Sequence, residues 1–429
     1  MVPALEPRAF LMSLFDLAVA AASAEATIEG HLPPRPRGRT VVVGAGKAAA
    51  AMARAVERHW DGLLDGLVVT PYGHGVPTAR VTVVEAAHPV PDAAGQAAAR
   101  RILELVQGLG PDDLVLALIS GGGSALLALP APGVALDDKR AVTRALLASG
   151  AAIHEINMVR KHLSAIKGGR LGATAAPAAV HALIVSDIPG DDAAFVASGP
   201  TLPDPTTKAD ARAILAKYRI VAPPGAACWL DEGEETPKPG DARLARATAS
   251  IITSAARSLD AAAEAARQRG VTPVLLSDCL EGEAREVGRA LAGIALHAAR
   301  RGQPAAAPCV LLSGGETTVT VGTPDPGFGG RNREFALALA LGLDGHPAIS
   351  ALVADTDGID GTPDAAGAIV TPDTLARARA LGRDPRADLA SHDSGGLFAA
   401  LGDAVVTGPT RTNVNDFRAI LVAPTTTGT

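Results

Sequence analysis

Three consecutive glycines inside an otherwise apolar segment constrain this chain more than any other feature. Residues 114–127 read LVLALISGGGSALL, so an apolar run of strand length enters the glycines and a second apolar run leaves them. Glycine allows positive φ and close approach of a ligand, and amides exposed at such a turn can cradle an anion. A plain turn between strand and helix explains one isolated motif equally well. The loop residues are Ser120, Gly121, Gly122, Gly123 and Ser124.

The pattern of a strand-like run ending in glycine occurs twice more. The run TVVV leads into Gly44-Ala45-Gly46-Lys47, and the segment LLSGGE contains Gly315 and Glu316. Strands that alternate with helices of this length predict a parallel sheet covered by helices on both faces. The carboxyl ends of such strands gather at one edge of the sheet. The repetition therefore favours a phosphate-handling enzyme over a set of unrelated turns.

The first of these turns has two alternative interpretations. Its GAGKAA sequence resembles the start of a dinucleotide-binding domain, but that match alone is weak. A dinucleotide site also needs an acidic residue at the end of the next strand, and GLVVTPYG has none. Lys47 inside the turn suits phosphate charge better. Since the chain has only seven lysines against thirty-two arginines, we do not expect this lysine to be an ordinary solvent-exposed residue without a specific role.

Size and composition narrow the class of protein. A chain of 429 residues is longer than a domain with a single hydrophobic core usually is, so two domains are expected. A net charge of −6 gives no electrostatic reason for binding nucleic acid or an anionic membrane. Three widely spaced cysteines fit neither a disulfide framework nor a zinc site, which favours the cytoplasm. The apolar stretch 10–24 contains Asp16 and falls short of a membrane span, so we expect an amphipathic helix there.

Carboxylates follow two strand-like runs. Asp187 and Asp191 come after HALIVS, and Asp357 comes after ISALVAD. Carboxylates at strand ends suit Mg²⁺, which takes oxygen ligands, or a base that accepts a hydroxyl proton. Capping and turn formation by aspartate are the structural alternative.

Basic side chains mark two further segments. The apolar spacing in the segment 153–171 predicts one amphipathic helix that contains Lys167 and is capped at Gly168-Gly169. This helix either lies on the surface or faces an anionic substrate. Arg331 enters an apolar helix after a glycine-rich stretch, where a guanidinium can bind a carboxylate or a phosphate. Residues 221–243 shift to Pro, Gly and acidic residues, which predicts an exposed loop near a domain boundary.

Ten motifs in order resemble one family. VGAGKA, HPVPD, SGGGSALL, EINMVRKHLSAIKGGRL, SDIPGDD, ASGPT, SGGETTVTV, GGRNREFALA, DTDGIDG and TGPTRTNVND are similar to the MOFRL-type glycerate 2-kinases, often labelled hydroxypyruvate reductases. The resemblance runs from about residue 8 to residue 423. It implies phosphorylation of D-glycerate at its 2-hydroxyl by ATP with Mg²⁺.

The resemblance also implies an α/β fold of two domains with the active site in the cleft between them. The first, residues 1–240, is expected to be Rossmann-like with a doubly wound parallel sheet, and the second, residues 241–429, a MOFRL-type α/β domain with a mixed sheet. Lys47, Asp187 and Arg331 are the expected catalytic residues, and Asp191 and Asp357 the metal candidates. The expected nucleotide-binding residues are Gly44, Gly46, Ser120, Gly121, Gly122, Gly123, Ser124, Lys167, Gly315 and Glu316.

Two rival functions stay open on the residues alone. NAD(P)H-dependent reduction of hydroxypyruvate fits the GAG turn, whereas the missing ribose carboxylate and the Ser120–Ser124 loop oppose it. A binding protein for sugar acids that kept the fold would bind without turnover. The expected partners are D-glycerate and ATP, with no nucleic acid or membrane, in a monomer or homodimer.

Overall fold

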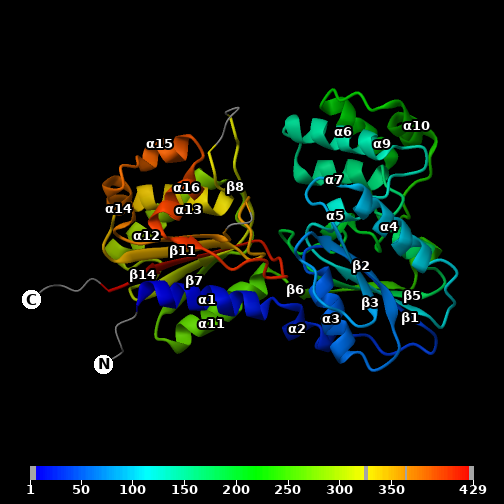
Figure 1. Ribbon diagram of the computed structural model, residues 1–429, viewed down its shortest axis with the longest axis horizontal. Coiled ribbons are helices and arrows are strands. Elements are labelled where there is room, and N and C mark those ends of the chain that lie inside the picture. The colour runs from blue at the N-terminus through cyan, green and yellow to red at the C-terminus, as the bar shows by residue number, and fades with distance from the viewer. Residues whose placement is uncertain (1–5, 323–326, 363–364, 425–429) are drawn as a thin grey trace, which may run out of the picture. The chain divides into compact units, whose positions relative to one another are not determined.

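The computed structural model describes residues 6–322, 327–362 and 365–424 and divides into two compact units (Figure 1). The N-terminal unit comprises residues 24–253, and the C-terminal unit comprises residues 1–23 together with 254–429. The expected boundary between residues 240 and 241 differs from this division for two reasons. Strand β6 (Ala247–Thr253) completes the N-terminal sheet, and helix α1 (Pro7–Ala21) packs on the C-terminal one.

The N-terminal unit contains a six-stranded parallel sheet in the order β3-β2-β1-β4-β5-β6. The chain starts at the centre with β1, moves outward through β2 and β3, and then crosses back to β4. This doubly wound order confirms the predicted fold class and puts a topological switch point between β1 and β4. The remaining strands are β1 (Thr40–Ala45), β2 (Asp65–Pro71), β3 (Val81–Ala86), β4 (Leu114–Ile119) and β5 (Ala179–Val185).

Helices cover both faces of this sheet, and a group of helices caps its carboxyl edge (Figure 1). Helix α4, whose cap Asp92 accepts the amide of Gly95, packs on one face, and α3 packs on the other. The cap has an apolar core of its own. The helices are α2 (Ala24–Thr27), α3 (Ala49–His59), α4 (Ala93–Leu105), α5 (Gly123–Leu126), α6 (Leu136–Ala148), α7 (Ile153–His162), α8 (Arg170–Thr174), α9 (Lys208–Lys217) and α10 (Pro224–Glu232), with short 3-10 turns η1 (Glu29–His31), η2 (Val196–Ser198) and η3 (Ala242–Leu244).

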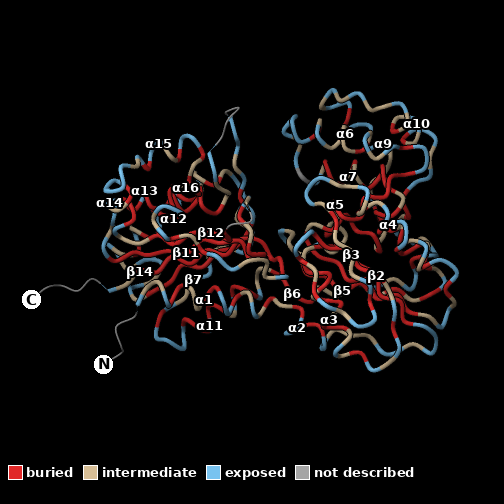
Figure 2. Tube along the Cα trace, in the orientation of Figure 1, coloured by how far each residue is buried: buried red, intermediate tan, exposed pale blue. Residues whose placement is uncertain are grey.

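The C-terminal unit contains a mixed six-stranded sheet in the order β13-β12-β11-β14-β9-β7, in which only the β7–β9 pair is parallel among the strands described. Alternate residues of each strand face opposite sides. Thus Leu311 packs with α12 and α13, and Leu312 packs with α1 and α11. Figure 2 shows the buried strands of this sheet in red. The mixed sheet predicted for this half is confirmed.

The elements of the C-terminal unit complete the description. Its strands are β7 (Thr272–Ser277), β9 (Cys309–Ser313), β11 (Ile349–Asp355), β12 (Gly367–Val370), β13 (Ala404–Val405) and β14 (Asp416–Val422), and β8 (Gly282–Glu283) pairs with β10 (Thr317–Thr318). Its further helices are α11 (Ala255–Gln268), α12 (Ala284–Arg301), α13 (Arg331–Leu343), α14 (Thr374–Ala380), α15 (Pro385–Ala390) and α16 (Ser394–Leu401). No helix within 6–322, 327–362 and 365–424 is both long enough and apolar enough to cross a membrane.

Two local predictions were wrong. The single helix expected from Ile153 to a C-cap at Gly168-Gly169 ends at His162 instead, because Leu163 leaves the helical conformation. The two glycines do adopt positive φ, but in the turn before α8. The loop expected over 221–243 contains α10, which has Pro223 as its N-cap and Pro224 as its first residue and buries Leu230 in the cap.

Replacement of Gly44 by alanine is expected to weaken the N-terminal unit. A Cβ there would lie 2.2 Å from the carbonyl oxygen of Leu118 on the neighbouring strand, so β1 and β4 would have to separate. We expect a loss of about 1–3 kcal/mol in the free energy of unfolding, measured by urea titration. Gly30→Ala is the matched control, because no atom lies within 4 Å of its added Cβ. An unchanged midpoint for Gly44→Ala would contradict this packing.

Candidate active site

The switch point between β1 and β4 brings together two of the predicted glycine turns. Ala45 pairs with Ile119 at the carboxyl ends of these strands, so both following loops leave the sheet side by side. The amide of Lys47 donates to the carbonyl of Gly121 at 2.8 Å, and the amide of Ala48 donates to the Ser120 hydroxyl at 3.0 Å. The two loops therefore form one hydrogen-bonded unit at the place where open α/β sheets bind ligands.

Gly122 is the most open position of the glycine loop. Its φ of 79° lies in the left-handed region, and the next residue begins the short helix α5. A Cβ on this residue would lie 3.0 Å from Nε2 of His88 and 3.4 Å from Cγ of Lys47. Lys47 is half-buried and His88 is exposed, so a lysine and an imidazole flank a patch of bare backbone.

Close packing explains the other glycines of these turns. A Cβ on Gly46 would lie 2.1 Å from the Ser120 hydroxyl oxygen, and one on Gly123 would lie 2.8 Å from the carbonyl oxygen of Ala45. The amide of Gly123 also donates to the Ser120 carbonyl at 3.2 Å, inside the loop itself. Gly44, Gly46 and Gly123 are thus required by the fold, whatever they contribute to a ligand.

Lys167 lies directly behind the glycine loop. Its side chain is fully buried, and its ammonium group donates to the carbonyl and, at 3.3 Å, to the hydroxyl of Ser124. The Ser124 hydroxyl in turn lies 2.8 Å from that of Ser198. Burial, together with the nearby cations Lys139 and Arg160, holds the pKa of Lys167 well below its usual range. The structure thus places Lys167, one of the predicted nucleotide-binding residues, against Ser124 of this loop.

Lys139 is a member of this site that the sequence did not indicate. It lies on α6, is 5% exposed, and its Nζ has no hydrogen-bond partner among the described residues. Burial, with added repulsion from Arg160 and Arg170, lowers its pKa to about 7. The available signal was composition: in a chain with seven lysines, each one deserves a structural explanation.

Asp187 and Asp191 follow β5, the neighbour of β4. Both are half-buried, and a turn separates them in which the Asp191 amide donates to the carbonyl of Ile188 at 3.0 Å. Asp191 itself has a φ of 54°, a conformation that aspartate tolerates better than most residues. The two carboxylates therefore lie at the same edge of the sheet as the glycine loop, one strand farther along.

The C-terminal unit holds a second predicted cluster around Arg331. Its guanidinium contacts Asp416 at 2.9 Å, Asp355 at 2.8 Å and Glu316 at 2.5 Å. Burial alone would lower the pKa of Arg331, but these carboxylates raise it well above its ordinary value. The structure thus brings Glu316 and Arg331 together, while Asp416, the first residue of β14, was missed by the sequence analysis.

The residues around this cluster fix its geometry. The amide of Asp357 donates to a carboxylate oxygen of Asp355 at 3.1 Å, and the side chain of Asp357 accepts the amide of Ile359 at 2.8 Å. The carbonyl of Gly315 accepts the amide of Asp416 at 3.1 Å. A Cβ on Gly315 would lie 2.2 Å from the amide nitrogen of Leu280, so this glycine too is required by packing.

The residues present fit a magnesium ion that is bound partly by carboxylates and partly by the phosphate oxygens of a nucleotide. They do not fit a cation that is bound by protein side chains alone. Across the described ranges 6–322, 327–362 and 365–424, no group of three or more His, Cys, Asp or Glu side chains is arranged to hold a metal. Mg²⁺ commonly needs only one or two carboxylates when phosphate oxygens and water complete its shell. Asp187 and Asp191 offer such a pair of donors.

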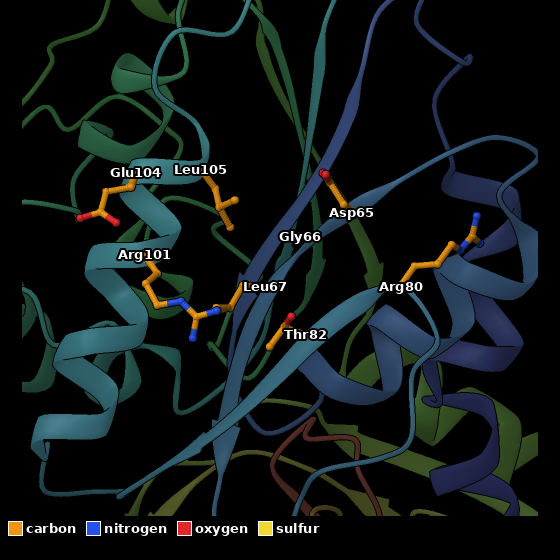
Figure 3. Close-up of a pocket in the computed structure, with 8 residues that line it drawn as sticks. All are labelled: Asp65, Gly66, Leu67, Arg80, Thr82, Arg101, Glu104 and Leu105. Carbon is orange, nitrogen blue, oxygen red and sulfur yellow. The ribbon is translucent and has the colours of Figure 1, made fainter.

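A surface hollow of about 390 Å³ lies away from these loops (Figure 3). Its lining comes from the amino ends of β2 and β3 and the last turns of α4, including Asp65, Arg80 and Arg101. It contains none of the predicted site residues, so it does not compete with the loop edge for the proposed chemistry.

Comparison with known proteins decides the family. Residues 10–231 match a domain of unknown function, DUF4147, and residues 309–416 match the MOFRL family. A D-glycerate 2-kinase from Thermotoga maritima is 41% identical over 391 residues, which cover 91% of this chain and 92% of that protein. The chain belongs to the family of MOFRL-type glycerate 2-kinases. The family predicted from the ordered motifs is thereby confirmed.

Other members of this glycerate 2-kinase family show how the names are distributed. A human glycerate kinase is 35% identical, covering 89% of this chain and 84% of that protein. A protein from Agrobacterium vitis that is named as a hydroxypyruvate reductase is 57% identical, and the match covers 97% of this chain and 94% of that protein. The crystal structure of a glycerate kinase from Thermotoga maritima superposes with a TM-score of 0.86 at 38% identity, covering 97% of this chain and 99% of that one.

Replacement of Lys139 by methionine is expected to stabilise the protein, most of all at low pH. The pKa of Lys139 is about 7 in the folded chain and 10.5 in the unfolded chain, so between these pH values the unfolded chain binds more protons. The free energy of unfolding therefore falls as the pH drops from 10.5 toward 7. Lys139→Met removes that penalty. We expect a rise in Tm of at least about 2 °C at pH 6 that shrinks toward pH 10, measured by calorimetry.

The exposed Arg144 lies on the same helix and provides the control for this effect. Arg144→Met removes one positive charge without touching a buried group, and its change in Tm should not follow this pH trend. A gain for Lys139→Met that is equal at pH 6 and pH 10 would rule out a shifted pKa as its cause.

Proposed function

We propose that this protein transfers the γ-phosphoryl group of ATP to the 2-hydroxyl of D-glycerate, giving 2-phosphoglycerate and ADP. The observation that carries the proposal is the joined pair of loops at the switch point, with Lys47 beside the bare backbone of Gly122. Phosphoryl transfer needs positioning and neutralisation of charge more than covalent participation by the protein. A lysine beside a glycine turn supplies both.

The N-terminal unit would act on the phosphate chain. Lys47 offsets charge on the phosphate oxygens, and the backbone of Gly122, which carries no side chain of its own, lies beside it. Asp187 accepts the proton of the 2-hydroxyl as that oxygen forms its bond to phosphorus and the bond to the leaving ADP breaks. Mg²⁺, when bound with the nucleotide, would supply positive charge to phosphate oxygens, with Asp191 as its candidate protein ligand in this unit.

Arg331 is our candidate for binding an anionic group of the substrate. Three carboxylates fix Arg331, and they use three of its five N–H donors. The remaining donors lie in the plane of a fixed fork, a geometry that matches a carboxylate or phosphate. We assign Arg331 to the carboxylate of D-glycerate and Glu316 to holding that guanidinium in place.

Reduction of hydroxypyruvate is the second candidate, since relatives carry that name and the strand order is that of dinucleotide-binding sheets. The end of β2 argues against it. There the Thr70 hydroxyl donates to the carbonyl of Gly46 at 3.1 Å, where a ribose-binding carboxylate would be needed. The acid at the end of β3, Glu85, is already bonded to the amides of Gly73 and Gly75.

Product identification tests the reaction. Purified protein with D-glycerate, ATP and Mg²⁺ is expected to form ADP and a product that enolase consumes without a mutase. Lys47→Met should lower kcat by at least about 100-fold while the protein stays folded, because a fixed positive charge at the phosphates is lost. Lys217→Met, which removes a lysine that is 60% exposed, is the control. Oxidation of NADH or NADPH by hydroxypyruvate, with no ADP formed from glycerate, would overturn the kinase.

Replacement of Arg331 by lysine tests the assignment to the substrate carboxylate. Lysine keeps the charge but cannot reproduce the planar fork that three carboxylates hold. We expect KM for D-glycerate to rise at least about ten-fold, the equivalent of one charged hydrogen bond, with KM for ATP little changed. Arg289→Lys on exposed α12 provides the comparison. A rise confined to KM for ATP would instead place Arg331 at the nucleotide.

A further inference from the structure

Three cations meet behind the glycine loop of the N-terminal unit without a carboxylate to balance them. Lys139 comes from α6, Arg160 from α7 and Lys167 from the turn before α8. The electrostatic influences on Lys139 are Arg160 and Arg170, and those on Lys167 are Lys139 and Arg160. Every one of these influences is repulsive.

The same unit shows how a buried cation is ordinarily accommodated. Lys161, one residue after Arg160, lies 3.6 Å from the fully buried carboxylate of Asp204 and over the ring of Phe195. An unpaired buried charge is costly, and proteins normally pair it or neutralise it. The absence of such a carboxylate among the influences on Lys139 and Lys167 therefore needs a reason other than packing.

The polar groups around the cluster are suited to an anion. Lys167 bonds to Ser124, and the Ser124 hydroxyl contacts that of Ser198, so donors already converge on the end of the glycine loop. The Nζ of Lys139 is buried and lacks a hydrogen-bond partner among the residues described. A buried donor without a protein partner, close enough to Lys167 to lower the pKa of that lysine, is the arrangement expected where a ligand oxygen completes the set.

We propose that Lys139, Arg160 and Lys167 form a binding site for the phosphate chain of a nucleoside triphosphate, with Lys139 donating directly to a phosphate oxygen. The inference rests on the proposed kinase function and extends it to two residues outside the predicted site. Three cations favour a multiply charged phosphate chain over the single carboxylate of glycerate. In the free protein burial and the neighbouring cations lower the pKa values of both lysines, so a bound phosphate chain favours their protonated, positively charged forms.

Calorimetric titration tests this site with ADP and ATP, and with adenosine and inorganic phosphate as the partial ligands. At pH 8 the free protein holds Lys139 mostly unprotonated, because its pKa is about 7. Binding of ADP should raise that pKa and take up a proton, seen as a heat that depends on the ionisation enthalpy of the buffer. The charges that act on Lys139 are those of Arg160 and Arg170. Lys167 is the other lysine of the cluster, and burial, together with Lys139 and Arg160, holds its pKa well below the usual range.

Lys139→Met separates the possible outcomes, with Arg144→Met as the matched control. We expect ADP to bind at least about ten-fold more weakly to Lys139→Met, without proton uptake, and adenosine to bind equally to all three proteins. Weaker inorganic phosphate binding by the variant would agree with the same site. The proton uptake of the wild-type protein needs no variant, so the test survives any folding defect.

Two results would overturn the inference while leaving the kinase intact. One is a wild-type protein that phosphorylates glycerate but takes up no proton with ADP, with unchanged ADP affinity in Lys139→Met. The other is a loss confined to D-glycerate affinity, which would assign the cluster to the substrate carboxylate. A wild-type protein that neither binds ADP nor forms phosphoglycerate would overturn the proposed function itself.

Discussion

The pairing of β1 with β4 is the interaction on which the N-terminal site depends. At this switch point the two following loops leave the sheet side by side and are hydrogen-bonded to each other, at the edge where open α/β sheets bind ligands. Their close approach depends on glycines at which a Cβ would strike the neighbouring residue, at Gly44 against Leu118 and at Gly46 against Ser120. The same residues that let the strands and loops approach so closely therefore also present Lys47 and the bare backbone of Gly122.

Charge is handled in opposite ways in the two units. Around Arg331 carboxylates outnumber the cation that they hold, and the guanidinium is fixed at the cost of its freedom to move. Behind the glycine loop cations gather without carboxylates, and burial lowers their pKa values instead. A fixed guanidinium suits recognition of a substrate of constant charge. A group of buried basic side chains with lowered pKa values suits a ligand that carries several negative charges.

Much of this arrangement could be predicted from sequence because the signals are local. Apolar runs of strand length that end in glycine predicted a doubly wound sheet, and the order β3-β2-β1-β4-β5-β6 confirms it. The grouping of Lys47 with the glycine loop followed from the rule that parallel strands end at one edge. The ordered motifs predicted the family, which the relatives confirm. Helix limits were harder to predict, since α7 ends at His162, where Leu163 leaves the helical conformation well before the glycines at 168 and 169.

The sequence by itself determined the fold class, the family and the residues at strand ends, because strand length, glycine and apolar periodicity act over a few neighbouring positions. Only the tertiary structure decided which charged side chains are paired. Lys139 and Lys161 look alike in sequence, yet one is buried without a carboxylate and the other lies against Asp204. Likewise Asp416 reaches Arg331 across 85 positions of the chain. Pairing of this kind depends on contacts between distant segments, and those exist only once the sheet and its helices have packed.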